Sequence, residues 1–236
     1  MNDRTTKRHY SRLTKDPAPP FAVIFDMDGV IVDSNPFHKV ALKQFCEKHG
    51  YFLSDDELRG RIFGRTNKDW LTSLFNGKVT AQQVKEFEAE KESLFREIFA
   101  PHIKPVKGLI SFLKMLETRQ IPRAVATSAP PANVEFTLEK TGTQKFFQVV
   151  VDGDAVENGK PHPEIYLKTA AAIHFSPQNC IIIEDSLSGI AAGRQAGCKV
   201  IGITTTHTRE ELQNTDLVID DFSDLILDDL IKLFNR

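Results

Sequence analysis

The sequence predicts an α/β fold, in which a parallel β-sheet is covered by helices on both faces and interrupted by a helical insertion. Short apolar runs of the kind found in buried strands recur along the chain. Segments of helix length separate most of these runs, and this alternation is typical of parallel sheets. Between about residues 35 and 103 the strand-like runs stop and only helical patterns continue, which predicts the insertion.

The first expected strand is Phe21–Phe25, an apolar run that stops at the turn-forming sequence Asp26–Gly29. Five later runs share its character and complete the expected sheet: Arg123–Thr127, Phe147–Val151, Cys180–Ile183, Lys199–Ile203 and Leu217–Ile219. Helical spacing of apolar residues predicts a helix before the second strand, at Leu109, Phe112, Leu113 and Leu116. A less regular pattern from Ile165 to Ala172 predicts another before the fourth strand.

Three helical patterns fill the insertion: Phe37–His49, Lys68–Phe75 and Ala81–Phe99. The last is rich in charge, and we interpret most of its charged residues as a solvated helix face: Glu86, Glu88, Glu90, Lys91 and Glu92. We therefore expect a tail over residues 1–19, an α/β core over 20–34 and 104–236, and a helical cap over 35–103.

Composition limits the possible partners. With 236 residues, 41% of them hydrophobic, the chain can bury one sizeable core and a small accessory domain. The formal net charge of -2 provides no field that would concentrate nucleic acid or an anionic membrane. No apolar stretch approaches the ~20 residues needed to cross a bilayer. We expect a small-molecule partner, no nucleic acid, no membrane and a monomeric protein.

Cysteine use and the N-terminal segment indicate the compartment. The three cysteines, Cys46, Cys180 and Cys198, show no C-x-x-C spacing and suit reduced thiols in the cytoplasm. The last two flank apolar runs, so we expect them in the core. The N-terminal tail is basic but lacks the apolar centre of a signal peptide, and we expect it to be mobile.

The strongest chemical signal is the pair Asp26 and Asp28 at the end of the first strand. Two residues apart on a strand, both side chains can point to one side of the sheet's carboxyl edge, where doubly wound proteins bind ligands. The alternatives are a turn that merely contains two aspartates and a glycine, or a fragment of a calcium loop. The calcium loop is set aside because Val30, Ile31 and Val32 follow where further oxygen ligands would be needed.

The sequence Asp26–Val30 resembles the first motif of the haloacid dehalogenase superfamily, and further motifs follow in the family's order. Thr127 ends the second strand, Lys160 begins a Lys-Pro sequence before a helix, and Glu184-Asp185 ends a later strand. The resemblance implies a Rossmann-like parallel-sheet core with an inserted helical cap. It also implies an enzyme that transfers or hydrolyses a phosphoryl group.

In this family the first Asp attacks phosphorus and the second is the general acid and base, so the resemblance assigns these roles to Asp26 and Asp28. The chemistry is sound by itself. A carboxylate is already an anionic nucleophile near pH 7. The leaving alkoxide needs a proton, which a second carboxyl group that is still protonated can supply.

The resemblance further implies that Thr127, with Ser128 beside it, binds a phosphoryl oxygen. It makes Asp185 a ligand of Mg²⁺, with Glu184 a second or water-mediated one, alongside Asp26 and the backbone carbonyl of Asp28, and these oxygens suit the ion. Clustered carboxylates would repel a phosphate dianion, since unit charges ~4 Å apart interact by about 4 kcal/mol at an effective dielectric constant of ~20. Mg²⁺ and Lys160 would offset this repulsion.

An insertion directly after the first motif resembles the branch with a small cap, which includes β-phosphoglucomutase and many sugar-phosphate phosphatases. His38 matches a histidine that assists the second Asp in the mutase group, although a solvated histidine is the alternative. The mutase pattern places a phosphate-binding Arg three residues after Gly64, where this chain has Asn67. Arg65 is the candidate replacement. Trp70 is expected in the core of the cap.

We therefore predict a magnesium-dependent phosphatase of a small phosphorylated metabolite, acting through an aspartyl-phosphate intermediate. A β-phosphoglucomutase or related hexose-phosphate mutase is the alternative, because the chemistry of Asp26 is shared and only cap residues discriminate. A non-catalytic sugar-phosphate binder is a third possibility, but it would have no need to retain both Asp26 and Asp28.

Overall fold

A computed structural model describes residues 21–61 and 67–235, and its centre is a six-stranded sheet of order β3-β2-β1-β4-β5-β6. The strands are β1 Ala22–Phe25, β2 Arg123–Ala126, β3 Val149–Val151, β4 Cys180–Glu184, β5 Lys199–Ile203 and β6 Leu217–Ile219. Every neighbouring pair is parallel. The six predicted strands and the predicted fold class are confirmed, and no strand end differs from its predicted position by more than two residues.

Strand β1 shows why its sequence is a continuous apolar run. Val23 and Phe25 contact one apolar cluster, whereas Ala22 and Ile24 contact another. Successive side chains of a strand point to opposite faces, so both faces of the sheet are covered. All four residues are fully buried, and β1 lies between β2 and β4 in the middle of the sheet.

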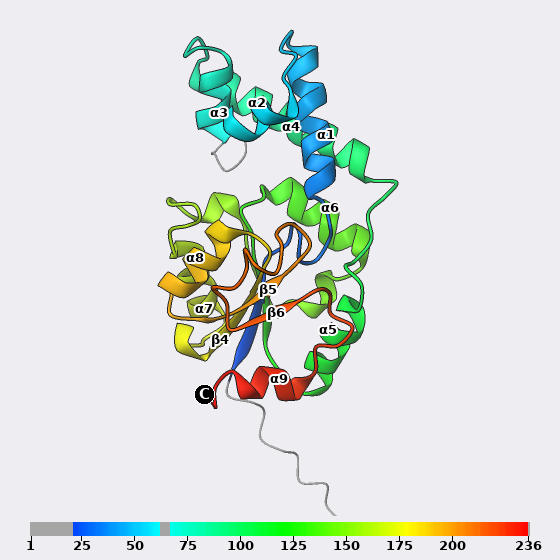
Figure 1. The fold of residues 1–236 in the computed structure, drawn as a ribbon, viewed down its shortest axis with the longest axis vertical. Coiled ribbons are helices and arrows are strands. Elements are labelled where there is room, and N and C mark those ends of the chain that lie inside the picture. The colour runs from blue at the N-terminus through cyan, green and yellow to red at the C-terminus, as the bar shows by residue number, and fades with distance from the viewer. Residues whose placement is uncertain (1–20, 62–66, 236) are drawn as a thin grey trace, which may run out of the picture.

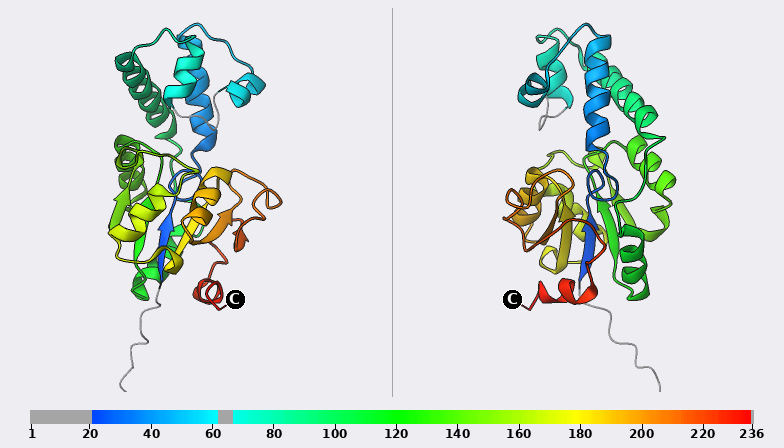
Figure 2. Two further views of the ribbon diagram at one scale, coloured as in Figure 1. Left: turned by 90° about the vertical axis from the view of Figure 1, so that its left-hand side faces the viewer. Right: turned by 45° about the vertical axis from the view of Figure 1, so that its right-hand side comes forward.

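Two groups of helices form these covering layers (Figure 2). The first apolar cluster includes residues of α5 Leu109–Thr118, α6 Pro131–Thr141 and α9 Leu227–Lys232. The second includes residues of α7 Glu164–Ala172 and α8 Leu187–Gln195. Short 3₁₀ turns lie at Gln144–Phe146, Gly153–Ala155 and Pro177–Asn179. Cys180 and Cys198 are buried in the second cluster, as expected.

The described part of the segment between β1 and α5 contains four helices and no strand, and the helices lie beyond the carboxyl edge of the sheet (Figure 1). Its helices are α1 Asn35–Lys48, α2 Asp55–Arg61, α3 Asn67–Leu74 and α4 Ala81–Phe99. They enclose a separate apolar cluster that includes Phe45, Leu58 and the predicted core residue Trp70. We call residues 35–103 the cap segment; their division from the core at these limits stays a prediction.

Two features of the cap segment differ from the expectation. Helix α2 was not predicted, because its sequence Asp-Asp-Glu-Leu-Arg-Gly-Arg lacks an apolar repeat. The solvated face expected on α4 is wrong for Lys91 and Glu92, which are only 8% and 7% exposed. Helix α4 packs along α1 and also contacts α6, so this part of the helix faces protein on two sides.

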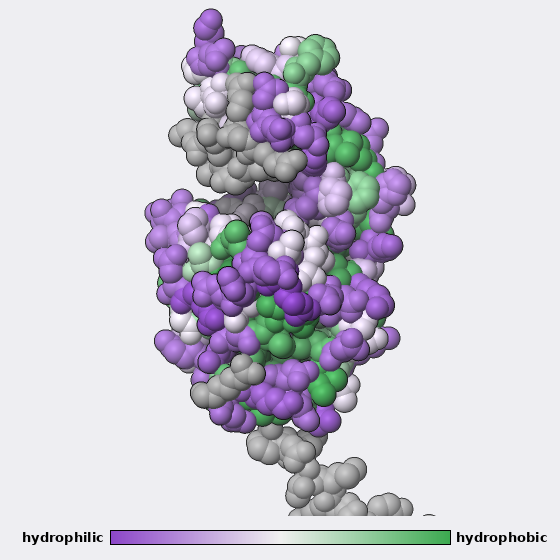
Figure 3. All heavy atoms as spheres, in the orientation of Figure 1, coloured by the Kyte–Doolittle hydropathy of each residue, from purple (hydrophilic) through white to green (hydrophobic). Residues whose placement is uncertain are grey.

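Hydrophilic side chains cover most of the face shown in Figure 3, with a smaller apolar area on the core. Within residues 21–61 and 67–235, no helix combines the length and apolar character needed to cross a membrane. The predicted N-terminal tail lies outside these described ranges.

Candidate active site

A pocket of about 200 Å³ lies at the carboxyl edge of the sheet. Six residues singled out from the sequence line it: Asp26, Asp28, Thr127, Ser128, Lys160 and Asp185. Glu184 lies behind the pocket and is fully buried. The convergence follows from the topology, because β2, β1 and β4 are neighbouring parallel strands and their carboxyl ends meet at one edge.

Lys160 joins two of the carboxylates. Its Nζ atom lies 2.6 Å from Asp26 Oδ1 and 2.6 Å from Glu184 Oε1. Burial alone would lower the pKa of Lys160, but the charges of Asp26 and Glu184 outweigh it and raise the pKa well above its usual value. The ammonium group is therefore charged and its position is fixed from two sides.

Glu184 is held by contacts within the protein. Its Oε1 accepts hydrogen bonds from Lys160 and, at 2.8 Å, from the hydroxyl of Tyr166. Its Oε2 accepts from the amides of Asp185 and Ser186, both at 2.9 Å, and from the Ser186 hydroxyl. Burial by itself would raise the pKa of Glu184, but the charge of Lys160 and these hydrogen bonds outweigh burial and lower the pKa below its usual value. Glu184 is therefore ionised.

Three carboxyl groups face a single lysine in this part of the site. Asp26, Glu184 and Asp185 each offer an oxygen, and these atoms lie within 4.8 Å of one another. Burial, followed by the charge of Glu184, raises the pKa of Asp185 to about 7. Burial also raises the pKa of Asp26 well above its usual value, although Lys160 opposes the shift.

These shifts indicate that the cluster lacks positive charge. A cation among the carboxylates would supply it, and a set of hard oxygen donors suits Mg²⁺ better than a soft metal. Asp26, Glu184 and Asp185 therefore fit the expected metal chemistry.

Asp28 has different surroundings, although it is only two residues from Asp26. Its Oδ1 accepts a hydrogen bond from the hydroxyl of Ser34 and lies 3.5 Å from Nε2 of His38. Burial raises the pKa of Asp28, but His38 and then Ser34 lower it below its usual value. The low pKa favours an ionised Asp28 in the site without substrate, and its expected protonation during the reaction stays a prediction.

His38 connects Asp28 to helix α4. Its ring stacks on Phe95, with centroids 3.6 Å apart and planes 6° from parallel. Its Nδ1 lies 3.0 Å from Nζ of Lys91. An ammonium group can only donate, so Nδ1 must accept, and the ring hydrogen is left on Nε2, which faces Asp28. The predicted proximity of His38 to Asp28 is thus present.

The contacts continue from α4 to the core. Lys91 donates to Glu92 Oε1 at 2.9 Å, and Glu92 Oε2 accepts from Nδ2 of Asn133 at 2.7 Å. Asn133 belongs to α6 and also accepts from Arg96 at 2.7 Å. Buried polar groups therefore link the cap segment to the core beside the pocket.

Thr127 and Ser128 face the pocket differently. Thr127 is buried, and its hydroxyl oxygen accepts from the amide of Ala129 at 3.1 Å. Its own hydrogen can therefore be donated to a ligand. Ser128 is exposed at the rim.

Several residues near the pocket were missed by the sequence reasoning: Ser34, Asn35, Lys91, Tyr166 and Thr206. Asn35 and Thr206 line the pocket beside Asp185, and their contacts are described below. Ser34 and Asn35 could have been suspected because they follow the first motif directly, but no local pattern distinguishes Thr206. Arg65 and the side chain of Asn67 lie outside the described residues.

The sequence model of the haloacid dehalogenase-like hydrolase family matches residues 23–203 of the chain. A phosphorylated carbohydrates phosphatase of Thermotoga maritima is 33% identical over 180 residues, which are 76% of this chain and 83% of the relative. A β-phosphoglucomutase of Bacillus subtilis is 30% identical over 218 residues, 88% of this chain and 92% of the relative. The crystal structure of a HAD hydrolase, family IA, variant 3, from Entamoeba histolytica has a TM-score of 0.85 at 30% identity, covering 92% of this chain and 100% of that one.

Proposed function

We propose that this chain, which belongs to the haloacid dehalogenase-like hydrolases, is a magnesium-dependent phosphatase that hydrolyses a small phosphorylated metabolite. Sugar phosphates are the preferred class, because the similar proteins include a phosphorylated carbohydrates phosphatase. The chain is an enzyme of the phosphatase and phosphotransferase type. The observation that carries the finer proposal is the meeting of Asp26, Lys160 and Asp185 in one pocket with Thr127.

Asp26 is the proposed nucleophile. Lys160 binds its Oδ1, which leaves Oδ2 to attack phosphorus. A bond forms between this oxygen and phosphorus while the bond between phosphorus and the ester oxygen breaks, giving an aspartyl phosphate. Thr127 donates its free hydrogen to a phosphoryl oxygen, and Lys160 offsets the negative charge of the transferring group.

Asp28 is the proposed acid and base. In the site without substrate its carboxyl group is ionised, so it must gain a proton before it can act as an acid. A phosphate dianion beside it favours this protonation. After the leaving alkoxide takes the proton, Asp28 is again an anion and can remove a proton from the water that attacks the aspartyl phosphate.

Asp26, Asp185 and the backbone carbonyl of Asp28 would hold Mg²⁺ directly. The oxygens of Glu184 are already engaged by Lys160, Tyr166 and Ser186, so we propose that Glu184 mainly positions Lys160. When bound, the ion supplies positive charge to the phosphoryl oxygens and orients them.

A phosphomutase is the second candidate. It is favoured by the similarity to β-phosphoglucomutase and by the contact between His38 and Asp28. A mutase must hold a second phosphate, and Asn67 replaces the Arg of the mutase pattern. A neutral amide cannot reproduce the bidentate grip of a guanidinium group. This substitution favours the phosphatase over the mutase.

A cytoplasmic location and a monomeric state complete the proposal. All three cysteines are buried and none forms a disulfide, as suits a reducing compartment.

A phosphate-release screen tests the proposal. Sugar phosphates, sugar-alcohol phosphates, nucleotides and phosphoglycolate would be compared with magnesium, with calcium and with excess chelator. We expect release that needs magnesium, is poorly supported by calcium and is greatest for a sugar phosphate. Full activity in chelator would contradict the metal site.

A second assay separates the two candidates. β-Glucose 1-phosphate with a bisphosphate primer should give free phosphate faster than glucose 6-phosphate, both measured on one sample. Rapid isomerisation with negligible phosphate release would contradict the phosphatase and favour the mutase, with Arg65 and Lys68 then the first residues to test.

A further inference from the structure

We propose that Asn35 and Thr206 act as positioning residues that connect the cap segment to the metal site. Together they hold Asp185 so that one of its oxygens stays available to a divalent cation, and they make cation binding depend on the first turn of α1. This inference rests on the metal site proposed above.

The side chains of Asn35, Asp185 and Thr206 are hydrogen-bonded to one another. Nδ2 of Asn35 lies 3.0 Å from Asp185 Oδ2 and 2.7 Å from Oγ1 of Thr206. The Thr206 hydroxyl donates its hydrogen to the same Oδ2. With a cation bound, Asp185 is ionised and its Oδ2 can only accept, so Asn35 then turns its NH₂ group toward Asp185. Both hydrogens of that group are then used, and the orientation of the amide is fixed.

Gly29 closes the remaining side of this oxygen. A Cβ atom at Gly29 would lie 2.0 Å from Asp185 Oδ2, and the residue has a positive φ of 78°, which favours glycine. The carbonyl of Gly29 accepts a hydrogen bond from the hydroxyl of Thr205, the neighbour of Thr206. Oδ2 is therefore enclosed by groups from three segments, which leaves Oδ1 as the oxygen for the cation.

Asn35 brings the cap segment into this arrangement, because it is the first residue of α1. The residue before it, Ser34, donates to Asp28 instead of capping its own helix. The start of α1 is thus attached to two pocket carboxylates, Asp28 and Asp185. A rotation of α1 relative to the core would stretch or break the Asn35 contact.

Thr206, by contrast, is held to the core. It follows β5 in a loop that hydrogen bonds fasten to the residues after β6. Thr204 donates to Asp220 at 2.9 Å, and Arg209 contacts the same carboxylate at 2.7 Å. One of the two groups that bind Asp185 Oδ2 is therefore fixed, and the other can move with the cap segment.

The consequence is a reciprocal coupling. Partners that hydrogen-bond a metal ligand commonly change metal affinity 10–100-fold when they are removed. If the position of α1 affects cation affinity through Asn35, then the bound cation must restrain α1 to the same degree.

Calorimetric titration of Mg²⁺ into the metal-free full-length protein, without substrate, tests the positioning role. We expect Thr206→Val and Asn35→Ala to weaken Mg²⁺ binding about 10–100-fold. Thr206→Ser keeps the hydroxyl and should restore the affinity. Thr208→Val removes a hydroxyl from the same loop whose contact is with the backbone amide of Glu211, at 3.3 Å, and it should bind Mg²⁺ like the wild type.

Affinities of Thr206→Val and Asn35→Ala within twofold of the wild-type value would overturn the proposal. If Thr206→Val fails to fold, as circular dichroism would reveal, Asn35→Ala at a half-buried position decides the matter.

Hydrogen exchange tests the coupling to the cap segment. Mg²⁺ should slow amide exchange in the first turn of α1 in the wild type and in Thr208→Val, but not in Asn35→Ala. Equal protection in Asn35→Ala would overturn the coupling. Both measurements omit substrate, so they separate this inference from the proposed function. A protein whose Mg²⁺ affinity depends on Thr206 but which releases no phosphate would support the inference and contradict the phosphatase.

Discussion

Asp26 and Asp28 are two residues apart, yet Asp26 contacts residues of the core whereas Asp28 contacts residues at the start of the cap segment. Asp26 is surrounded by core residues, with Lys160 bound to it and Glu184 and Asp185 beside it. Asp28 is bound by Ser34, at the junction, and faces His38 of the cap segment. Burial acts on both carboxyl groups, but its effect prevails for Asp26, whose pKa is raised, and not for Asp28, whose pKa is lowered.

The difference suggests a division of labour. The core fixes the proposed nucleophile and the charges expected to surround the phosphoryl group. The cap segment contacts the proposed acid and base through His38 on α1, and Lys91 on α4 contacts His38 in turn. Substitutions around Asp26 should therefore abolish turnover, whereas substitutions around Asp28 should change how turnover depends on the leaving group.

Asp26→Asn should have the largest effect. Asn keeps the volume of Asp but lacks the anionic nucleophile, so phosphate release should fall on the order of 10⁴-fold or more. Thermal unfolding should show that the fold is retained, because the substitution removes one of several crowded negative charges. A folded Asp26→Asn protein with substantial turnover would contradict the proposed role of Asp26 as the nucleophile.

Asp28→Asn should have the next largest effect, and it should depend on the substrate. Loss of general acid and base catalysis reduces rates about 10²–10⁴-fold, and we expect such a loss for a sugar phosphate. The loss in kcat/KM, which reports formation of the aspartyl phosphate, should be smaller for p-nitrophenyl phosphate, whose leaving group needs little protonation. Steady-state kinetics on both substrates makes the comparison. Equal losses in kcat/KM would remove the distinction between Asp26 and Asp28.

His38→Asn should have a smaller effect of the same kind. A hydrogen bond to a charged group contributes ~1.5–3 kcal/mol, which corresponds to a loss of about 10–100-fold in rate. The loss should be greater for a sugar phosphate than for p-nitrophenyl phosphate, because His38 acts through Asp28.

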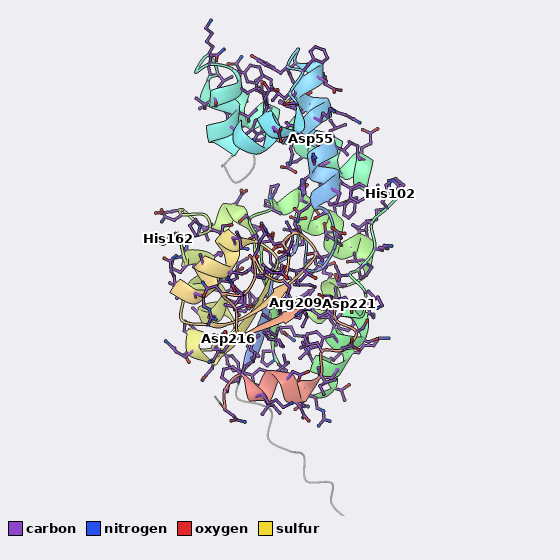
Figure 4. The ribbon with its side chains drawn as sticks, in the orientation of Figure 1. Asp55, His102, His162, Arg209, Asp216 and Asp221 are labelled. Atoms are coloured by element: carbon purple, nitrogen blue, oxygen red, sulfur yellow. The ribbon has the colours of Figure 1, made fainter. Side chains whose placement is uncertain are left out.

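His102→Asn is the matched control. His102 stacks on Phe37 near the base of α1 but lies at the outer edge of the molecule, away from the pocket (Figure 4). Its removal should leave both rates unchanged. Equal effects of the two substitutions would assign His38 a purely structural role.

Asn133→Ala should have the smallest effect on turnover and act mainly on stability. It removes the donor to Glu92 Oε2, and an unsatisfied buried acceptor costs ~1–3 kcal/mol. For a chain of this size, each kcal/mol lowers the melting temperature by about 2–4 °C. Asn179→Ala, at an exposed position, should change stability by less than about 0.5 kcal/mol. An unchanged melting temperature of Asn133→Ala would show that this link between cap segment and core is weak.

The sequence predicted the site residues that directly follow a strand. Asp26, Thr127 and Asp185 each follow an apolar run, and parallel strands bring such positions to one edge. Lys160 does not follow a strand, so only the resemblance to the family's motif predicted it as a site residue. These residues could be named before the structure because local patterns determine where they lie.

The cap side could not be predicted in this way. Lys91 and Glu92 occur in a charged helix, and nothing local distinguishes them from their solvated neighbours. Their burial depends on His38 and Asn133, which are 53 and 41 residues away in the sequence. The pairing of Asn35 with Thr206 spans 171 residues. Such contacts arise from the packing of whole helices and loops, which an apolar repeat does not encode.

Reductive trapping of the phosphoenzyme tests the central claim, that Asp26 receives the phosphoryl group, most directly. Asp28→Asn would be mixed with p-nitrophenyl phosphate and Mg²⁺, then quenched with borohydride, which reduces an aspartyl phosphate to homoserine. The first step needs no acid for this substrate, but the attack of water has lost its base, so the intermediate should accumulate. The account predicts homoserine in place of Asp26 in the peptide mass spectrum. An unmodified Asp26, or homoserine at any other aspartate, would contradict it.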